Sequence, residues 1–283
     1  MIKIENFEVV GWEHAIRGMR NPKNSWDRSD SKWNHNFDGT RYIGKFNYDN
    51  NFECEFDNES DSQGAFCENA YTDCFCLGIE IGPNDHKLMM TLANGGPVHA
   101  KYRRFIDIYV DITAPLYWWK EFDTYRAGVC PHPMDIEVNS CSTMHKVMDK
   151  KFELDDFSHE HLINHVRVTG AEAAYFAMPT GTLNLIISTL NACREAYIGA
   201  VKAKDEEMAK VYWNQVIQLL PSSYNQKRTV KLTYETAANI HQWRKKIPHK
   251  LDEWRVFGEW LESLPYSEIF TGEKPKIELI SEG

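Results

Sequence analysis

The sequence predicts an α/β fold with a strand-rich first half and a helical second half. Turn-forming Asn, Asp, Ser and Gly residues crowd positions 21–64, whereas apolar residues recur at helical spacing from position 182 onward. The composition, with 42% hydrophobic and 26% charged residues, is that of an ordinary globular protein. These observations together exclude disordered and collagen-like chains.

In chain order, the first 90 residues are expected to form strands and loops with little helix. The run F-I-D-I-Y-V-D-I at 105–112 is rich in β-branched and aromatic residues, which predicts a strand. Pro115 then suits the first turn of a helix that carries Leu116, Trp119 and Phe122 on one stripe.

Four further helices are expected in the second half. The first spans 182–204, and the apolar residues at helical spacing in it are Leu183, Ile186, Ile187, Leu190, Cys193, Tyr197 and Val201. Asp205 begins a second helix that ends at Leu220-Pro221, and both helices are expected to pack in the core. The last two, at about 233–246 and 249–264, are separated by Pro248, which breaks a helix.

The length of 283 residues fits about two domains or one large α/β domain. We predict a single domain over residues 1–283 with an acidic insert at about 45–90, because residues 51–90 hold nine acidic residues and one lysine. No apolar stretch approaches the roughly 18 residues of a membrane span, and Lys3 and Glu5 interrupt any signal sequence. Seven irregularly spaced Cys favour reduced thiols and a cytoplasmic location, and the Asn- and Lys-rich composition is also compatible with a virus-encoded protein.

The net charge and its distribution along the chain indicate which class of ligand the protein binds. The net charge of −9 argues against binding of duplex nucleic acid. Residues 226–255, by contrast, hold eight basic and three acidic residues, a local excess that favours a compact anionic ligand. A solvated helix face explains this local charge equally well.

The motifs of the familiar hydrolases, kinases and Rossmann enzymes are absent from the sequence. Cys54, Cys67, Cys74 and Cys76 lack the paired spacing of zinc sites, so we predict buried thiols there and no metal. Cys141 has no visible base partner and is expected to serve packing.

Three clusters of polar and basic residues remain as candidates for chemistry. They are His99 to Arg104, Tyr125-Arg126 with Asn139 to Ser142, and a third cluster that runs from Leu220-Pro221 through Arg228, Gln242 and Arg244 to the segment His249 to Arg255. Arginine matters in them because its planar fork binds phosphate in a bidentate manner and stacks on flat rings.

In this order the clusters resemble the flavin-dependent thymidylate synthases, over about residues 97–263. That family has Ala-Pro before a helix that ends in Arg-His-Arg, followed by Ser-x-Asn-Glu-x-Ser-x-Arg. Ala114-Pro115 and Arg126 keep this spacing, with Thr124 and Tyr125 in place of the first Arg and the His. Asn139 and Ser142 match the later Asn and Ser after an insertion around 130–138.

The family's later elements also find matches. Its Leu-Pro corresponds to Leu220-Pro221, its Asn-x-x-x-x-Arg to Asn239 and Arg244, and its His-Ala-Gln-x-Glu-Ile-Arg to His249, Glu253 and Arg255. The resemblance implies an enzyme that uses FAD, methylenetetrahydrofolate and NADPH to methylate C5 of the uracil ring of dUMP. It also implies a homotetramer whose active sites are shared between subunits.

The resemblance assigns roles residue by residue. The residues expected to contact the flavin are His99, Arg126, Asn139, Gln242, Arg244 and His249. Those expected to face the nucleotide are Glu121, Ser140, Ser142, Arg228 and Arg255, with Ser142 and Arg255 assigned to catalysis and Lys227 as the competitor for the position of Arg228. Simpler roles compete with these: Asn139 and Ser142 as caps of a helix, Glu121 as a solvent-facing residue, and Glu253 with Arg255 as a surface charge pair.

Two positions depart from the family pattern. Ser140 stands where the family has Glu, and Met144 stands where it has a substrate-binding Arg, with His145 next to it. Three hypotheses follow: a thymidylate synthase, an enzyme that methylates or hydroxymethylates another pyrimidine nucleotide such as dCMP, and a non-catalytic nucleotide-binding or assembly protein of the same fold.

Overall fold

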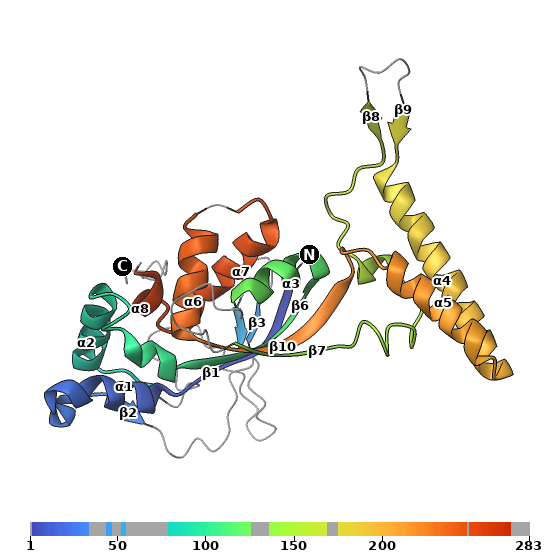
Figure 1. The fold of residues 1–283 in the computed structure, drawn as a ribbon. Helices are drawn as coiled ribbons and strands as arrows, with labels where there is room; N and C mark the ends of the chain where they lie inside the picture. Colours follow the sequence, from blue (N-terminus) through green and yellow to red (C-terminus); the bar gives the residue numbers. More distant parts are fainter. Residues whose placement is uncertain are drawn as a thin grey trace, which may run out of the picture. The chain divides into compact units, whose positions relative to one another are not determined.

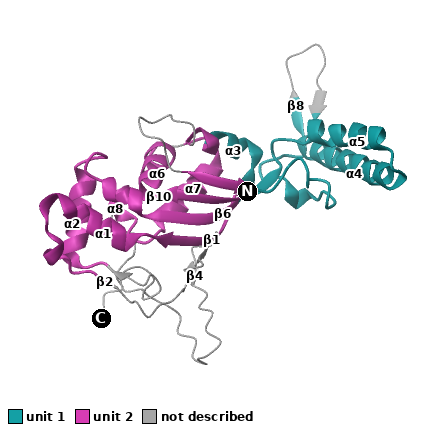
Figure 2. Ribbon diagram, turned by 60° about the horizontal axis from the view of Figure 1, so that its bottom comes forward, with its two compact units in different colours: residues 1, 113–121, 140–227 teal, residues 2–112, 122–139, 228–283 magenta. Residues whose placement is uncertain are grey.

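The computed structural model describes residues 2–33, 44–46, 52–54, 79–125, 136–168, 175–247 and 249–272. The chain forms two compact units, unit 1 with residues 1, 113–121 and 140–227, and unit 2 with residues 2–112, 122–139 and 228–283 (Figure 2). The single domain expected over residues 1–283 stays a prediction. Most of the acidic insert, three of its cysteines and one predicted site residue lie outside the described residues, namely Cys67, Cys74, Cys76 and Arg126.

A six-stranded sheet, most of which belongs to unit 2, has the strand order β4-β3-β1-β6-β10-β7. Its strands are β1 (Lys3–Val10), β3 (Gly44–Phe46), β4 (Phe52–Cys54), β6 (Asp107–Pro115), β7 (Glu137–Ser140) and β10 (Asn225–Thr233). β1 pairs antiparallel with β3, and β3 pairs antiparallel with β4. The sheet therefore joins segments from both halves of the chain.

Strand β6 confirms the strand predicted at 105–112, with its start shifted by two residues and its end at Pro115. Ile108, Val110 and Ile112 are buried, and the residues between them are at least partly exposed, as the period of two requires. Sequence analysis predicts no strand at β10. The alternation there is hidden because its inward positions include Gln226 as well as Val230 and Leu232.

The helices of unit 2 are α1 (Trp12–Arg20), α2 (Pro83–Asn94), α6 (Tyr234–Ile240), α7 (Asp252–Glu262) and α8 (Glu268–Thr271). Its 3-10 turns are η1 (Asn21–Lys23), η2 (Trp26–Arg28), η4 (Lys101–Phe105) and η5 (Asp123–Tyr125). A π-helical turn, η7 (His241–Lys245), continues α6. The short strand β2 (Lys32–Trp33) pairs antiparallel with β5 (Ile79–Glu80). α6 and α7 lie on one face of the sheet (Figure 1). Phe7 of β1 meets Trp260 of α7 there, with ring centroids 6.0 Å apart. The core of this unit is therefore strongly aromatic.

Helices α1 and α2 correct the expectation of little helix in the first 90 residues. In α1, Trp12, Ala15, Ile16 and Met19 are buried on one face at helical spacing. The helix begins after Gly11, which has φ 93°, so no Ser, Thr, Asp or Asn cap marks its start in the sequence.

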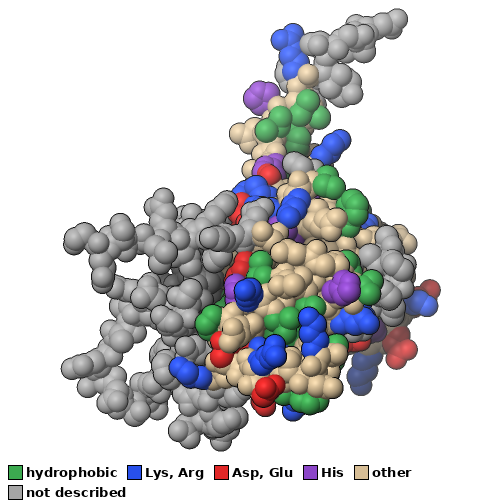
Figure 3. Space-filling model, turned by 90° about the vertical axis from the view of Figure 1, so that its left-hand side faces the viewer, with side chains coloured by type: hydrophobic (Ala, Val, Ile, Leu, Met, Phe, Trp, Pro, Cys, Tyr) green, Lys and Arg blue, Asp and Glu red, His purple; other side chains and the backbone are tan. Residues whose placement is uncertain are grey.

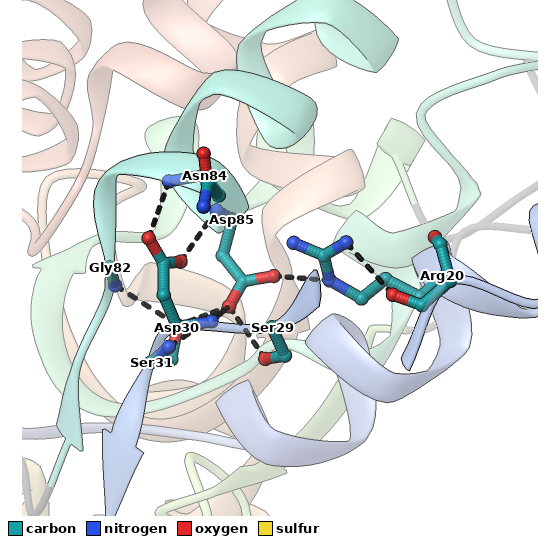
Figure 4. A network of polar contacts seen from close by, with 8 residues as sticks. Arg20, Ser29, Asp30, Ser31, Gly82, Asn84 and Asp85 are labelled. Atoms are coloured by element: carbon teal, nitrogen blue, oxygen red, sulfur yellow. Dashed lines mark hydrogen bonds and ion pairs between the residues drawn. The ribbon is translucent and has the colours of Figure 1, made fainter. Parts of the chain in front are cut away.

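A buried polar cluster ties residues 29–31 to α2 (Figure 4). The carboxylate of Asp85 is 0% exposed and accepts hydrogen bonds from Nε of Arg20 at 2.6 Å and from the hydroxyls of Ser29 and Ser31 at 2.7 Å each. The backbone N–H groups of Asp30 and Ser31 donate to it as well, at 3.2 and 3.1 Å. Burial raises the pKa of Asp85, but these hydrogen bonds and the charge of Arg20 outweigh burial and hold the pKa below its ordinary value.

Unit 1 is built on a hairpin of two helices, α4 (Pro179–Ala203) and α5 (Glu206–Leu219). Both predicted helices are thus confirmed, and Asp205 caps α5 by accepting the N–H of Met208 at 3.0 Å. Leu183, Leu190 and Val216 are buried in a small core. Val201, by contrast, is 50% exposed, so only part of the predicted apolar stripe packs within this unit.

Unit 1 also contains α3 (Leu116–Phe122), whose last residue is assigned to unit 2. This helix confirms the one predicted after Pro115. The strands β8 (Val166–Val168) and β9 (Tyr175–Ala177) of unit 1 pair antiparallel. Across both units, the described helices include none that is long and apolar enough to span a bilayer.

Candidate functional site

The turn η5 follows α3 directly and is anchored by aromatic packing within unit 2. The side chain of Phe122 is fully buried, and its ring stacks on Trp254 of α7 at 6.4 Å with an interplanar angle of 16°. Tyr125, at the end of η5, meets the same Trp254 ring edge to face at 5.9 Å. Trp254 therefore fixes the segment that precedes the predicted residue Arg126, which itself lies outside the described residues.

Arg244 reaches this aromatic group from the π-helical turn η7. Its Cζ atom lies 5.1 Å from the ring centroid of Trp254 and 5.6 Å from that of Tyr125. These distances are within the range of cation–π contacts. A π-helical turn widens the backbone by one residue and recurs at functional sites. The structure thus places Arg244 over Tyr125, the residue that stands where the family motif has its His.

His249 packs on the same indole ring, at 6.3 Å. The N–H of Leu251 donates to Nδ1 of His249 at 3.1 Å, so Nδ1 is the acceptor and the neutral ring carries its proton on Nε2. His249 therefore offers a donor at Nε2, and Trp254 is the common neighbour of two predicted flavin residues.

Arg228 of β10 contacts Asp123, the first residue of η5. Its Nη1 donates to both carboxylate oxygens of Asp123, at 2.9 and 3.2 Å, and its side chain is 13% exposed. Asp123 begins η5 and Tyr125 ends it, so this short turn holds Arg228 at one end and Arg244 at the other. We call the group of Asp123, Tyr125, Arg228, Arg244, His249 and Trp254 the η5 cluster.

The η5 cluster combines planar cations with aromatic faces. A guanidinium that lies over two rings, beside an imidazole donor, suits a flat ligand that carries negative charge. The charge of Arg228 is balanced by Asp123, so an anion that binds Arg228 must compete with that carboxylate.

The other described site residues predicted in unit 2 are His99, Gln242, Asn139 and Arg255. His99, Gln242 and Asn139 are exposed, in the loop before η4, in η7 and in β7 respectively. Arg255 is 49% exposed and donates to both oxygens of Glu259 on the same helix, at 2.8 and 3.0 Å. This pair is a surface contact of α7, and Glu253 is 6% exposed.

Three predicted nucleotide residues belong to unit 1. Ser140 and Ser142 are exposed, and Glu121 at the end of α3 is half-buried. Oγ of Ser142 accepts the N–H groups of Met144 at 3.2 Å and His145 at 2.9 Å. The residues after Ser142 form bends and a turn, so Ser142 caps a turn and not a helix. The assigned roles of these residues stay predictions.

The described part of the chain contains no group of three His, Cys, Asp or Glu side chains that could hold a metal ion. Its cysteines with described side chains, Cys141 and Cys193, are free thiols. Cys141 is exposed, which corrects the expectation that it serves packing.

Sequence reasoning missed three members of the η5 cluster as site residues. Tyr125 stands in a candidate cluster and replaces the family's His but is assigned no role, and Trp254 lies unremarked between Glu253 and Arg255. Asp123 gives no signal at all, because its contact with Arg228 joins positions 105 residues apart.

Comparison with known proteins supports the fold. No protein-family model matches the sequence, and none of the curated proteins matches it. A solved structure of thymidylate synthase X (ThyX) from Helicobacter pylori with FAD and dUMP aligns over 96% of this chain and 98% of its own, with 11% identity and a TM-score of 0.51. A second structure of the flavin-dependent thymidylate synthase ThyX from that organism, also with FAD and dUMP, aligns over 95% and 98%, with 10% identity and a TM-score of 0.51.

A UMP/dUMP methylase, PolB from Streptomyces cacaoi bound with 5-Br dUMP, aligns over 68% of this chain and 80% of its own at 13% identity, but its TM-score of 0.43 does not establish a shared fold. The two ThyX structures do establish one, and at 10% and 11% identity they show the fold alone. This α/β chain therefore has the fold of the flavin-dependent thymidylate synthases.

Proposed function

We propose that the protein is a flavin-dependent enzyme that methylates C5 of a pyrimidine nucleotide, and in the first place a thymidylate synthase that converts dUMP to dTMP. The observation that carries this proposal is the position of Arg244 over the rings of Tyr125 and Trp254. Two sequence segments that resemble the family's motifs thus meet in one site. The fold shared with ThyX supports the same reading.

The residues of the η5 cluster fit FAD by their chemistry. A flavin is a flat ring system joined to a pyrophosphate, and the cluster offers the planar cation of Arg244, held on buried rings, and the Nε2 donor of His249. Arg244 and His249 would hold the cofactor, with Arg126, Asn139, Gln242 and His99 as further contacts implied by the resemblance. When bound and reduced by NADPH, the flavin supplies hydride, and methylenetetrahydrofolate supplies the carbon unit.

The protein's own tasks are then to bind, orient and stabilise charge. Arg244 would balance negative charge on the cofactor, and His249 would donate from Nε2. Arg228 would bind the nucleotide phosphate in place of the carboxylate of Asp123, so Asp123 would compete with the phosphate for Arg228. The resemblance also assigns Glu121, Ser140, Ser142 and Arg255 to the nucleotide.

A second candidate function is the modification of another pyrimidine nucleotide, such as dCMP. Met144 favours it, because an uncharged side chain that is 47% exposed stands where the family has a substrate-binding Arg. The loss of a donor to a charged group costs about 1.5–3 kcal/mol, or roughly ten- to a hundredfold in affinity. Ser140 in place of Glu removes a negative charge and so favours a ring with a different hydrogen-bonding edge.

We also propose a homotetramer, supported by apolar side chains that the α4–α5 hairpin leaves in solvent. Leu185, Val201 and Val211 are 67%, 50% and 42% exposed, more than a helix pair with no partner would be expected to show. Light scattering coupled to size-exclusion chromatography measures the mass, and a flavin-loaded monomer would contradict the proposal.

Two measurements test the proposed activity. The absorption spectrum of the purified protein, before and after titration with FAD, shows whether it binds flavin, and a protein that binds none is the non-catalytic relative. A panel of dUMP, dCMP, UMP and CMP with methylenetetrahydrofolate and reduced flavin, run on wild type and Met144→Arg, then identifies the substrate. We expect Met144→Arg to strengthen dUMP binding roughly ten- to a hundredfold. Fast dTMP formation that is equal in both proteins would show that Met144 has no role in substrate choice.

A further inference from the structure

A pocket of about 690 Å³ lies between α1 and η4 in unit 2. The end of β1 and the start of β6 complete its walls, and none of its lining residues belongs to the η5 cluster. Its volume is within the range of about 300–1,000 Å³ that small-molecule sites occupy. The size alone therefore suits an organic ligand rather than a single ion.

Two glycines shape this pocket. Gly11 has φ 93°, and a Cβ atom there would lie 1.9 Å from the carbonyl oxygen of Phe105, so α1 starts in direct contact with the end of η4. Gly18, about two turns further along the helix, also lines the pocket and faces the ring of Phe105, which would lie 3.9 Å from a Cβ at this position. At these two positions, before His14 and after Arg17, the pocket wall carries no side chain.

Two arginines give the pocket its charge. Arg17 comes from α1 and Arg104 from η4, and neither forms an ion pair with a carboxylate in the part of the chain that the structure describes. The one acidic residue in the lining is Asp107, and Nζ of Lys231 lies 2.8 Å from its carboxylate. The pocket therefore keeps an excess of positive charge, which an anion with several oxygens would balance.

His14 adds a neutral donor to the two cations. Nη2 of Arg17 lies 3.0 Å from Nδ1 of His14. A guanidinium nitrogen only donates, so Nδ1 accepts, and the neutral ring carries its proton on Nε2. Three donor groups from two elements thus line one pocket.

Phe105 supplies an apolar wall. It is 52% exposed, which is unusual for a Phe, and it lines the pocket next to Arg104. The face on which α1 and α2 lie shows many Lys and Arg side chains with Asp and Glu side chains among them (Figure 3). Arg28 and Lys101 are exposed in the segments beside the pocket. This surface would attract an anionic ligand.

We propose that this pocket binds a nucleoside phosphate, in addition to the ligands of the η5 cluster. The phosphate lies between Arg17 and Arg104 with Nε2 of His14 as a further donor, and the flat base packs on Phe105. This site goes beyond the proposed methylating activity and does not depend on it.

Isothermal titration calorimetry of the full chain with ADP, inorganic phosphate and adenosine tests the proposal. We expect ADP to bind more tightly than either fragment, and the double variant Arg17→Gln/Arg104→Gln to bind ADP about a hundredfold more weakly. Phe105→Ala should weaken ADP but leave inorganic phosphate unchanged. Lys23→Gln is the matched control, because it removes an exposed positive charge from η1 outside the pocket and should have no effect. Single variants at the exposed Arg17 decide the test if the double variant fails to fold.

Several outcomes would overturn the proposal. One is the absence of binding of ADP and of phosphate at millimolar concentration, and another is ADP binding that the arginine variants leave unchanged. Equal affinity for adenosine and ADP would remove the role of the arginines, and equal affinity for phosphate and ADP would remove that of Phe105. Binding of ADP that is lost in Arg244→Lys would place it at the η5 cluster instead. FAD titration of the same variants keeps this result separate from the proposed enzymatic activity.

Discussion

Two arginines of unit 2 are held in contrasting ways. Arg20 is 4% exposed and donates to Asp85, whose carboxylate collects hydrogen bonds from four residues (Figure 4). Arg244 is half-buried and lies over the rings of Trp254 and Tyr125. The first arrangement is a closed network between chain segments, whereas in the second a partly exposed guanidinium lies on buried rings. We therefore expect the Asp85 network to serve stability, and we propose that the η5 cluster serves binding.

The largest expected effect is that of Asp85→Ala on stability. The variant leaves the buried guanidinium of Arg20 without its carboxylate, and removal of one partner of a buried ion pair costs about 3–5 kcal/mol. Urea unfolding measures the free energy. Lys87→Ala, an exposed position on the same helix, is the control and should change stability by less than about 0.5 kcal/mol. A loss below about 1 kcal/mol in Asp85→Ala would contradict a stabilising role for this network.

Arg244→Lys should affect binding more than stability. Lysine keeps the charge but lacks the planar face that lies over Tyr125 and Trp254, so FAD affinity should fall roughly ten- to a hundredfold while the unfolding free energy changes by less than about 1 kcal/mol. FAD titration followed by absorbance measures the affinity. Lys250→Arg, a charge-conserving change at an exposed position nearby, is the control. Equal FAD affinity of Arg244→Lys and wild type would exclude Arg244 from the flavin site.

These two arginines also show what sequence can predict. Arg244 is found from sequence because motif spacing is local, and the helices at α4 and α5 are found because their apolar periodicity is local as well. The partner of Arg20 is 65 positions away, and the contact of Arg228 with Asp123 spans 105, so neither has a signal in one sequence. β10 and α1 are missed for a related reason. Inward polar residues such as Gln226 hide the first, and a glycine start hides the second.

Acid should destabilise the protein through Asp85. The folded state lowers the pKa of this carboxyl, so its contribution to stability is fully present above the ordinary value of 3.8 and is lost as the pH falls below it through the folded pKa. The effect should be smaller than that of Asp85→Ala, because a protonated carboxyl still fills the site. Urea midpoints measured from neutral to acidic pH, on wild type and Asp85→Asn, test this. A slope at acidic pH that is the same in both would assign acid sensitivity to other groups.

The smallest expected effect on stability is that of Arg255→Ala, which tests whether this arginine serves stability or nucleotide binding. Arg255 is 49% exposed and pairs with Glu259 on α7, and an exposed pair of this kind contributes about 0.3–0.5 kcal/mol. Both Arg255→Ala and Glu259→Ala remove this pair, and Glu259→Ala also removes the 3.5 Å contact of Glu259 with Lys245, so both should lower stability little and Glu259→Ala slightly more. If Arg255 faces the nucleotide, as the resemblance implies, only Arg255→Ala should also weaken nucleotide binding and turnover. Nucleotide titration and rates measured on both variants decide this, because an equal loss in the two would mean that Arg255 acts only through its surface pair, and no loss in either would remove it from the site.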